Sequence, residues 1–166
     1  MKVVVCGMAG VGKNTLGEAI AEEFDLDFYS GGDILKEIAR EEGYQPTEDW
    51  WDTEEGMKFV REREKDSKFD KELDEKLMNK LDQGEVVVTS RTMPWLYDGD
   101  CFNIWLKAPQ KVRAKRIAKR DGISFKNALE KVKERDKENK ELYNDLYGIK
   151  LGEDFEPFDM IVDTVS

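Results

Sequence analysis

The segment VVVCGMAGVGKNTL, residues 3–16, places the strongest limits on how this chain can fold. Its run of valines predicts a buried strand, and the apolar spacing after Lys13 predicts an amphipathic helix. Between them, Gly7, Gly10 and Gly12 let the backbone curl so that successive N–H groups point into one concavity. Lys13 adds a cation at the start of the helix, where the helix dipole also favours an anion. This order predicts a phosphate-binding loop, and a chance glycine-rich turn is the weaker interpretation.

One position departs from the usual loop pattern, G-x-x-x-x-G-K-[ST], which has a hydroxyl directly after the lysine. Here that position is Asn14, and the hydroxyl of Thr15 comes one residue later. Asn14 offers only an amide oxygen to a metal, and we expect Thr15 to face the α-phosphate. The strand predicted at 85–89 ends in Thr89 and is followed by Ser90, so it supplies no carboxylate either. We therefore expect Mg²⁺ to be held mainly by phosphates and water, with no dedicated metal ligands from the protein.

Five short apolar runs alternate with helical patterns along the 166 residues. Short runs rich in Val and Ile suit the strands of a parallel sheet that is buried on both faces. The expected strands cover 2–6, 26–30, 85–89, 101–107 and 158–163. The pattern predicts one α/β domain over 1–166, with a five-stranded parallel sheet flanked by helices. The stretch 33–84 is too long for one crossover helix, so it predicts a small helical subdomain at the edge of the sheet.

The segments between the expected strands carry apolar residues at helical spacing, which predicts amphipathic helices. Pro109 is expected to open one helix and Ser124 to cap the next. The residues expected to face the core are Leu16, Ala19, Ile20 and Phe24, then Ile34, Leu35, Ile38 and Ala39, then Phe69, Leu73, Leu77 and Leu81, and then Ala114, Ile117, Ala118, Ala128, Leu129 and Val132.

Composition excludes several classes of function. The formal net charge is −10, whereas sequence-independent nucleic-acid binding requires a basic surface. The chain has no histidine and only two cysteines, so it offers neither a histidine-activated nucleophile nor a tetrahedral zinc site. No transmembrane or signal-peptide pattern appears. We therefore expect a cytoplasmic monomer without nucleic-acid or membrane partners.

The loop pattern G-x-x-G-x-G-K-x-T, with a non-hydroxyl residue before the threonine, resembles that of the nucleoside monophosphate kinases. FYSGGDILKEIAREEGY looks like the monophosphate-binding helix of that family, and VVVTSR resembles its third strand, which ends in a substrate-binding arginine. Residues 103–150 closely resemble the second half of archaeal-type cytidylate kinases, and FDMIVDT is similar to their final strand.

This resemblance implies a P-loop NTPase fold with a short lid at 113–125 and a monophosphate-binding subdomain at 33–84. It implies transfer of the γ-phosphoryl group of ATP to CMP or dCMP, with Mg²⁺ as cofactor. The residues expected to bind ATP are Gly7, Met8, Ala9, Gly10, Val11, Gly12, Lys13, Asn14 and Thr15. The residues expected to act in catalysis are Lys13, Arg91, Arg116 and Arg120. The residues expected to bind the monophosphate are Lys36, Arg91 and Arg135.

The remaining charged and aromatic residues admit structural interpretations. Arg113 is expected on a solvated helix face, and Arg40, Arg61 and Arg63 are expected at the surface. Asp70 and Asp74 either accept from an exocyclic amine of the substrate or pair with Lys71 and neighbouring lysines, and the second interpretation is favoured. The tryptophans that either pack in the interior or line a base pocket are Trp50, Trp51 and Trp95.

Three positions depart from the family pattern and affect mainly the acceptor site. Lys36 stands where relatives usually have an arginine, and Asn139 and Leu142 stand where they often carry an acid and an arginine. Adenylate or another monophosphate kinase is therefore the alternative within the same class. A P-loop switch or ATPase that phosphorylates no nucleotide is the alternative from another class, but such a protein needs neither an arginine-bearing lid nor a helical subdomain.

Overall fold

A computed structural model describes residues 1–47, 54–65 and 68–165 of the chain. Its centre is a sheet of five strands in the order β2-β3-β1-β4-β5, and every pairing between neighbouring strands is parallel. The strands are β1 (Lys2–Gly7), β2 (Asp27–Tyr29), β3 (Val86–Thr89), β4 (Phe102–Lys107) and β5 (Met160–Asp163). The predicted five-stranded parallel sheet is confirmed.

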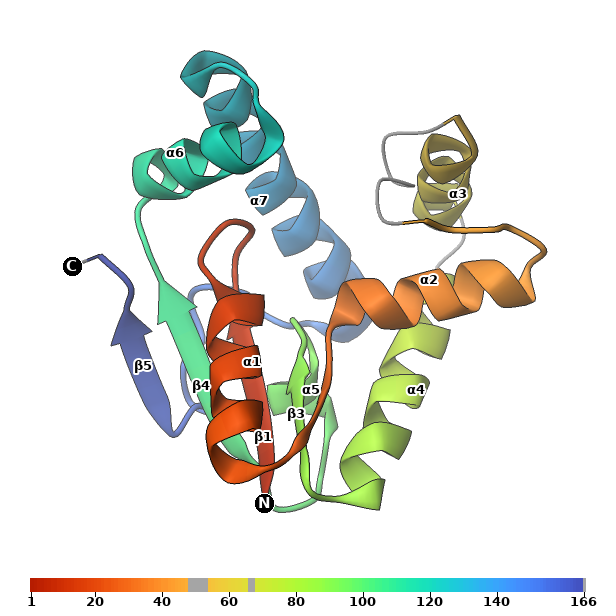
Figure 1. Cartoon of the computed structure of the whole chain (residues 1–166), viewed down its shortest axis with the longest axis vertical. Coiled ribbons are helices and arrows are strands. Elements are labelled where there is room, and N and C mark those ends of the chain that lie inside the picture. Colours follow the sequence, from red (N-terminus) through yellow and green to blue (C-terminus); the bar gives the residue numbers. More distant parts are fainter. Residues whose placement is uncertain (48–53, 66–67, 166) are drawn as a thin grey trace.

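Seven helices join the strands in the described part of the chain. They are α1 (Lys13–Phe24), α2 (Gly31–Glu41), α3 (Glu54–Lys65), α4 (Lys68–Gln83), α5 (Met93–Leu96), α6 (Gln110–Asp121) and α7 (Phe125–Tyr147). Figure 1 shows α6 and α7 beyond the carboxyl ends of the strands on one side, with α3 on the other side. The loop that joins β1 to α1 lies at the same end of the sheet, next to α6 and α7.

The central strand β1 is buried on both faces, and its side chains divide the core into two layers. Val4 packs in the layer that contains residues of α2 and α4, whereas Val3 and Val5 pack in the layer that contains Ala21 of α1. Successive side chains of a strand point to opposite faces, so a run of valines supplies both layers at once. Each fully buried Val contributes about 1.5–3 kcal/mol relative to its exposed state.

The expected core face of α1 is partly wrong. Ala19 is exposed and Phe24 is 54% exposed, whereas Gly17 and Ala21 are buried. The reason is close packing against β2, because a Cβ atom added to Gly17 would lie 2.5 Å from Cε2 of Phe28. The missing side chain therefore sets which face of the helix approaches the sheet, and apolar spacing alone does not reveal it.

The other helical predictions hold. Phe69, Leu73, Leu77 and Leu81 are all buried along α4. Pro109 is the N-cap residue of α6, and Oγ of Ser124 accepts a hydrogen bond of 3.1 Å from the backbone N–H of Asn127 at the start of α7. The four expected residues of α2, and Ala114, Ile117, Ala128 and Val132, are also buried, while Ala118 and Leu129 pack against them as partly buried residues.

The described part of 33–84 consists mainly of α2, α3 and α4. Trp50 and Trp51 lie outside the described residues. Across the ranges that the structure describes, no helix combines the length and apolar character that crossing a bilayer requires.

Candidate active site

The glycine-rich loop between β1 and α1 has the backbone shape that its sequence predicts. Gly10 has φ of 78° and Gly12 has φ of 100°, both in the left-handed region that favours glycine. At Gly7 the constraint is space, because a Cβ atom would lie 2.7 Å from Cγ1 of Val11 and 2.8 Å from the carbonyl oxygen of Leu106. The loop therefore curls tightly against β4 and leads directly into the first turn of α1.

The side chain of Lys13 folds back over this loop. Its Nζ donates hydrogen bonds of 3.0 Å to the carbonyl oxygens of Gly7 and Met8. Burial lowers the pKa of Lys13 well below its ordinary value, and the positive charge of Arg91 lowers that pKa further. Lys13 and Arg91 therefore lie within electrostatic reach of each other, beyond the carboxyl ends of β1 and β3. An anion placed between them would favour the charged form of Lys13 and so oppose this lowering of its pKa.

Arg91 lies on a turn that is stabilised by hydrogen bonds with the side chains of neighbouring residues. Oγ of Ser90 accepts hydrogen bonds of 3.0 and 3.1 Å from the backbone N–H groups of Thr92 and Met93. Oγ1 of Thr92 donates a 2.5 Å hydrogen bond to Oδ1 of Asp74 on α4. These bonds fix the backbone on both sides of Arg91. Its Nε is buried and has no hydrogen-bond partner in the described part of the chain.

The expectation that Asp74 pairs with surface lysines is wrong. Asp74 is buried, and its second oxygen accepts a 2.6 Å hydrogen bond from the hydroxyl of Tyr147 at the end of α7. Burial raises the pKa of Asp74, and the hydrogen bonds from Thr92 and Tyr147 oppose that rise. Asp74 thus joins α4, the turn that carries Arg91, and α7.

The expectation for Asp70 is wrong in the same way. Asp70 is buried and forms a 2.7 Å ion pair with Arg63 of α3, while Lys71 is exposed. Arg63 is therefore not a free surface residue, because its guanidinium lies against a buried carboxylate. Arg40 and Arg61 are exposed, as expected.

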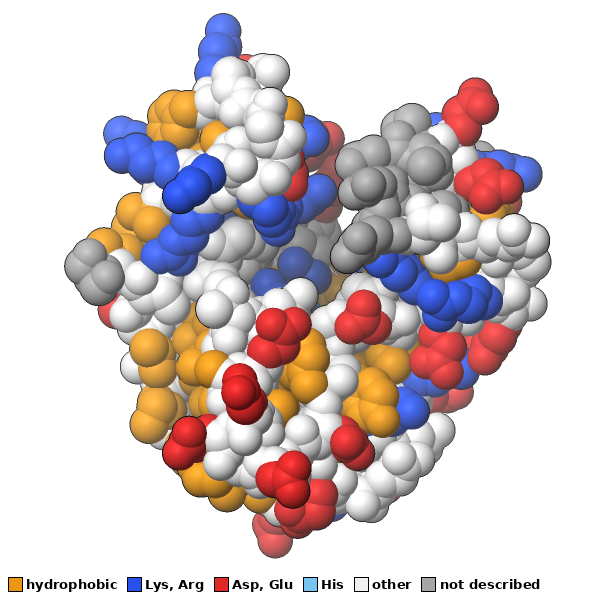
Figure 2. All heavy atoms as spheres, in the orientation of Figure 1, with side chains coloured by type: hydrophobic (Ala, Val, Ile, Leu, Met, Phe, Trp, Pro, Cys, Tyr) orange, Lys and Arg blue, Asp and Glu red, His pale blue; other side chains and the backbone are white. Residues whose placement is uncertain are grey.

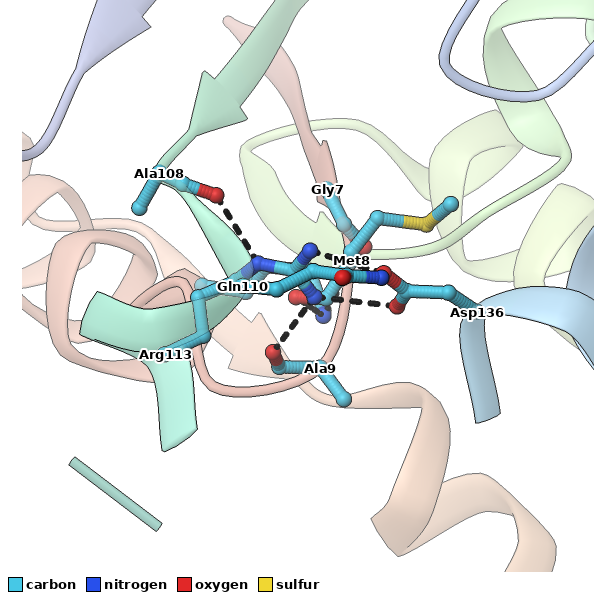
Figure 3. A network of polar contacts seen from close by, with 8 residues as sticks. Gly7, Met8, Ala9, Ala108, Gln110, Arg113 and Asp136 are labelled. Atoms are coloured by element: carbon cyan, nitrogen blue, oxygen red, sulfur yellow. Dashed lines mark hydrogen bonds and ion pairs between the residues drawn. The ribbon is translucent and has the colours of Figure 1, made fainter. Parts of the chain in front are cut away.

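Arg113 is buried, so its predicted place on a solvated face is also wrong. Figure 3 shows its guanidinium at the centre of a polar network. Nε donates to the carbonyl oxygen of Ala108 at 2.9 Å, and Nη1 donates to that of Ala9 at 3.3 Å. Nη1 and Nη2 also donate to the two carboxylate oxygens of Asp136 at 2.9 and 2.7 Å. One side chain thus joins the phosphate loop, the end of β4 and helix α7.

Asp136 completes this network from α7. Its Oδ2 also accepts a 3.1 Å hydrogen bond from Nε2 of Gln110. Burial tends to raise the pKa of Asp136, but the hydrogen bonds from Arg113 and Gln110 bring it below its ordinary value. Helical spacing could have indicated that each of the two residues is buried, although it does not show that they pair with each other. Arg113 is four residues before buried Ile117, and Asp136 is four residues after buried Val132.

Arg116 reaches the phosphate loop from one turn further along α6. Its Nη1 donates to the carbonyl oxygen of Val11 at 3.3 Å and to Oγ1 of Thr164 at 2.9 Å, and its Nη2 donates to the carbonyl oxygen of Thr164 at 2.7 Å. Beside it lies a mainly apolar pocket of about 440 Å³. The residues that line this pocket are Val11, Gly12, Thr15, Leu16, Ala19, Leu106, Arg116, Val162 and Thr164.

Three of the predicted site residues form no hydrogen bond to the phosphate loop among the residues that the structure describes. Arg120 is exposed and forms an ion pair of 2.8 Å with its neighbour Asp121. Arg135 is exposed on α7, and Lys36 is half-buried on α2. The structure therefore brings together Lys13, Arg91 and Arg116 around the loop, and the other three side chains lie on the helices that flank it.

The chain is similar in sequence to a family of kinases. Residues 3–166 match the model of the cytidylate kinase-like family. The cytidylate kinase of Pyrococcus horikoshii is 35% identical over 162 residues, which cover 98% of this chain and 79% of that protein. The cytidylate kinase of Methanocaldococcus jannaschii is 34% identical over 168 residues, covering 99% of this chain and 88% of that protein. The chain belongs to the cytidylate kinase-like family.

Solved structures share the fold of this cytidylate kinase-like protein. An uncharacterized protein from Eubacterium ventriosum superposes with a TM-score of 0.68 at 17% identity, covering 98% of this chain and 88% of that one. Shikimate kinase from Bacteroides thetaiotaomicron gives a TM-score of 0.56 at 17% identity, covering 99% of this chain and 86% of that one. At such identities the likeness shows the fold alone, and it confirms the predicted P-loop kinase fold.

The charge distribution of this family member is uneven. Figure 2 shows a hollow between the side formed by α6 and α7 and the side formed by α3, with Lys and Arg side chains at its floor and margins. Asp and Glu side chains gather below the hollow, over α1. A local basic site therefore exists in a chain whose net charge is −10.

Leu142, one of the positions that depart from the family pattern, and Trp95 both pack against other side chains. Leu142 is partly buried and packs against an apolar cluster that includes Met8 and Trp105. Trp95 packs edge-on against Phe158, with ring centroids 5.3 Å apart, and its Nε1 donates to Asp154. Packing is thus the structural role of Trp95.

Proposed function

We propose that this protein transfers the γ-phosphoryl group of ATP to CMP or dCMP and releases ADP with CDP or dCDP. The observation that carries the proposal is the position of Lys13 and Arg91 beyond the carboxyl ends of the paired strands β1 and β3, where Lys13 bonds to the loop and Ser90, next to Arg91, bonds to Val5 of β1. In open α/β sheets ligands bind at this edge, and phosphoryl transfer needs cations there to neutralise the reacting phosphates. The names of the Pyrococcus horikoshii and Methanocaldococcus jannaschii relatives support cytidylate as the acceptor.

The donor nucleotide is assigned to the loop and the pocket beside it. The backbone N–H groups of the nine predicted loop residues, from Gly7 to Thr15, would bind the phosphates, with Nζ of Lys13 moving from two carbonyl oxygens to the β- and γ-phosphates. The apolar pocket beside Arg116 suits a purine ring, since its walls are mainly aliphatic and a guanidinium can lie over an aromatic face.

The donor atoms around the loop fit a magnesium ion that arrives with the nucleotide. Asn14 and Thr15 are exposed at the start of α1, while Oγ1 of Thr89 already accepts a hydrogen bond from the N–H of Gly31. Within the described ranges, no cluster of three metal-binding side chains is present. When bound, Mg²⁺ would neutralise phosphate charge, with the amide of Asn14 and the hydroxyl of Thr15 as the nearest protein oxygens.

The acceptor phosphate is assigned to Arg91, with Lys36 and Arg135 on the flanking helices. Arg91 has a guanidinium whose two parallel N–H groups match a phosphate, and its buried Nε has no hydrogen-bond partner among the described residues. In the reaction an oxygen of the acceptor phosphate bonds to the γ-phosphorus while the bond to the β-phosphate oxygen breaks, so ADP leaves. The charges of Lys13 and Arg91 would surround the group in transfer, while Arg116 lines the pocket assigned to the purine.

Closure of the two flanking regions completes the proposal. The stretch 33–84 would act as the monophosphate-binding subdomain and 113–125 as the lid. Arg113 and Arg116 are anchored to the loop, so the part of the lid that moves would begin after Arg116 and carry Arg120 inward. Excluding water from the γ-phosphate protects ATP from hydrolysis.

The acceptor assignment predicts unequal effects of two conservative exchanges. We expect Arg91→Lys to lower kcat/KM for CMP about 30- to 1,000-fold. Lysine retains the positive charge but cannot form the two parallel hydrogen bonds that a guanidinium makes to a phosphate. Lys36→Arg should have a much smaller effect or increase kcat/KM. Steady-state kinetics with CMP varied at saturating ATP measures both. If Arg91→Lys weakens ATP binding as much as CMP use, Arg91 belongs to the donor side and this assignment fails.

A panel of acceptors tests the function itself. ADP release from ATP is followed with CMP, dCMP, UMP, AMP and GMP at equal concentrations. We expect CMP or dCMP to give the highest kcat/KM. A preference for AMP of about tenfold or more, equivalent to ~1.4 kcal/mol, would instead identify an adenylate kinase.

A further inference from the structure

A buried side chain of α6 holds one carbonyl group of the phosphate loop. Arg113 is 5% exposed, and its Nη1 donates to the carbonyl oxygen of Ala9 at 3.3 Å. The next residue, Gly10, has φ of 78°, and a Cβ atom there would lie 2.9 Å from Cδ1 of Ile117 and 3.0 Å from the carbonyl oxygen of Arg113. The peptide group between Ala9 and Gly10 therefore lies directly against α6.

This contact fixes the direction of a backbone N–H group. In a trans peptide, the C=O of one residue and the N–H of the next point in opposite directions, and the described part of the chain has no cis peptide bond. Because the carbonyl of Ala9 points at Arg113, the N–H of Gly10 faces away from α6. Arg116 holds the carbonyl of Val11 in the same way, again directly before a glycine with positive φ.

The position of Arg113 is itself set by groups outside the loop. Its Nη1 and Nη2 donate to the two oxygens of buried Asp136 at 2.9 and 2.7 Å, and its Nε donates to the carbonyl oxygen of Ala108 at 2.9 Å. Gln110 donates to the same carboxylate at 3.1 Å. A planar guanidinium whose three nitrogens all have acceptors has little freedom to turn. The end of β4 and helix α7 thus determine where the carbonyl of Ala9 is held.

We infer that Arg113 is a positioning residue for the donor nucleotide, because it holds the carbonyl of Ala9 and so directs the N–H of Gly10 at a phosphate oxygen of ATP. The inference rests on the proposed function and names what keeps its loop in the binding shape. A glycine has many accessible backbone conformations, so a loop without this support would lose conformational entropy when it binds a phosphate. Donors that are already oriented avoid that cost.

The test measures the affinities of the full-length protein for ATP, ADP and CMP separately, by isothermal titration calorimetry. Arg113→Lys keeps a positive charge for Asp136, but one ammonium group cannot replace the bonds to Asp136 and to the carbonyl of Ala9 together. We expect the Kd for ATP and for ADP to rise about tenfold or more. The Kd for CMP should stay within about twofold. A purely structural role would lower the melting temperature without this difference between the nucleotides.

Arg63→Lys is the matched control. It alters a second arginine–aspartate pair, in which Nη2 of Arg63 lies 2.7 Å from Oδ1 of buried Asp70. That pair joins α3 to α4 rather than α6 to the phosphate loop. We expect the Kd of Arg63→Lys for ATP to stay within about twofold of the unmodified protein. Equal losses of ATP affinity in the two folded variants would overturn the inference.

Thermal melting establishes that each variant is folded before its affinities are compared. If Arg113→Lys does not fold, Asp136→Asn provides the same readout, because its amide has the shape of the carboxylate but only one oxygen for Arg113. A folded variant that binds ATP as tightly as the unmodified protein overturns the inference and leaves the kinase function intact.

A measurement on the unmodified protein complements the variants. In a sample labelled with ¹⁵N-glycine, we expect the amide proton of Gly10 to move downfield when ADP is added and to stay in place when CMP is added. No movement with bound ADP would overturn the inference alone. If the unmodified protein binds neither ATP nor ADP, the proposed function fails and the inference fails with it.

Discussion

Lys13→Ala is expected to lower the rate of phosphoryl transfer about 1,000-fold, or ~4 kcal/mol in the activation barrier. The variant removes the cation that would lie on the β- and γ-phosphates, and no other lysine holds the carbonyl oxygens of Gly7 and Met8 in the described part of the chain. Single-turnover transfer from ATP to CMP measures the loss. Because burial already disfavours the charged form of Lys13, its removal should leave the midpoint of urea unfolding nearly unchanged.

The matched control is Lys115→Ala on the exposed face of α6, which removes the same charge away from the loop. That variant should keep its rate within about twofold, since a solvated lysine contributes little. Near-normal turnover in folded Lys13→Ala would show that the donor nucleotide binds elsewhere.

Asp136→Ala is expected to reduce the free energy of unfolding by about 3–5 kcal/mol, the largest stability effect that we predict. The reason is that the guanidinium of Arg113 stays buried against the loop and loses both bonds to its carboxylate partner. Urea denaturation measures the change. Asp121→Ala is the control, because it breaks an exposed ion pair with Arg120 and should cost only about 0–1 kcal/mol. Equal effects of the two variants would show that the buried pair does not hold α7 to the loop.

The same pair predicts a dependence on pH. The pKa of Asp136 is below its ordinary value of 3.8 in the folded chain, with burial opposed by the hydrogen bonds from Arg113 and Gln110. A lowered pKa gives stability that is present above 3.8 and is lost as the pH falls through the folded value. The stability difference between the unmodified protein and Asp136→Ala should therefore persist down to pH 3.8 and shrink below it.

The sheet and the phosphate loop were predictable because their signals are local. A run of valines before three glycines and a lysine requires no knowledge of the rest of the chain, and the strand predicted at 85–89 is found at Val86–Thr89. The loop shape followed from the residues themselves, because Gly10 and Gly12 occupy backbone angles that other residues rarely adopt.

The buried ion pairs were not predictable in the same way, because each depends on how distant helices meet. Arg113 lies between lysines on a charged helix, and its partner comes 23 residues later, after α7 has turned back along α6. The same explanation applies to Asp70 and Asp74. Their neighbours in sequence are lysines, but their partners come from α3, the turn after β3 and the end of α7. Local charge patterns therefore predicted ion pairs at the surface, whereas these side chains form buried ion pairs and hydrogen bonds in the folded chain.

Direct analysis of the products tests the central claim that this protein is a cytidylate kinase. ATP labelled at the γ-phosphate is incubated with CMP, and the nucleotides are separated by anion-exchange chromatography. Our account predicts labelled CDP and unlabelled ADP in equal amounts, with almost no label released as inorganic phosphate, because the closed site excludes water. ADP and free phosphate without CDP would identify an ATPase and contradict the account.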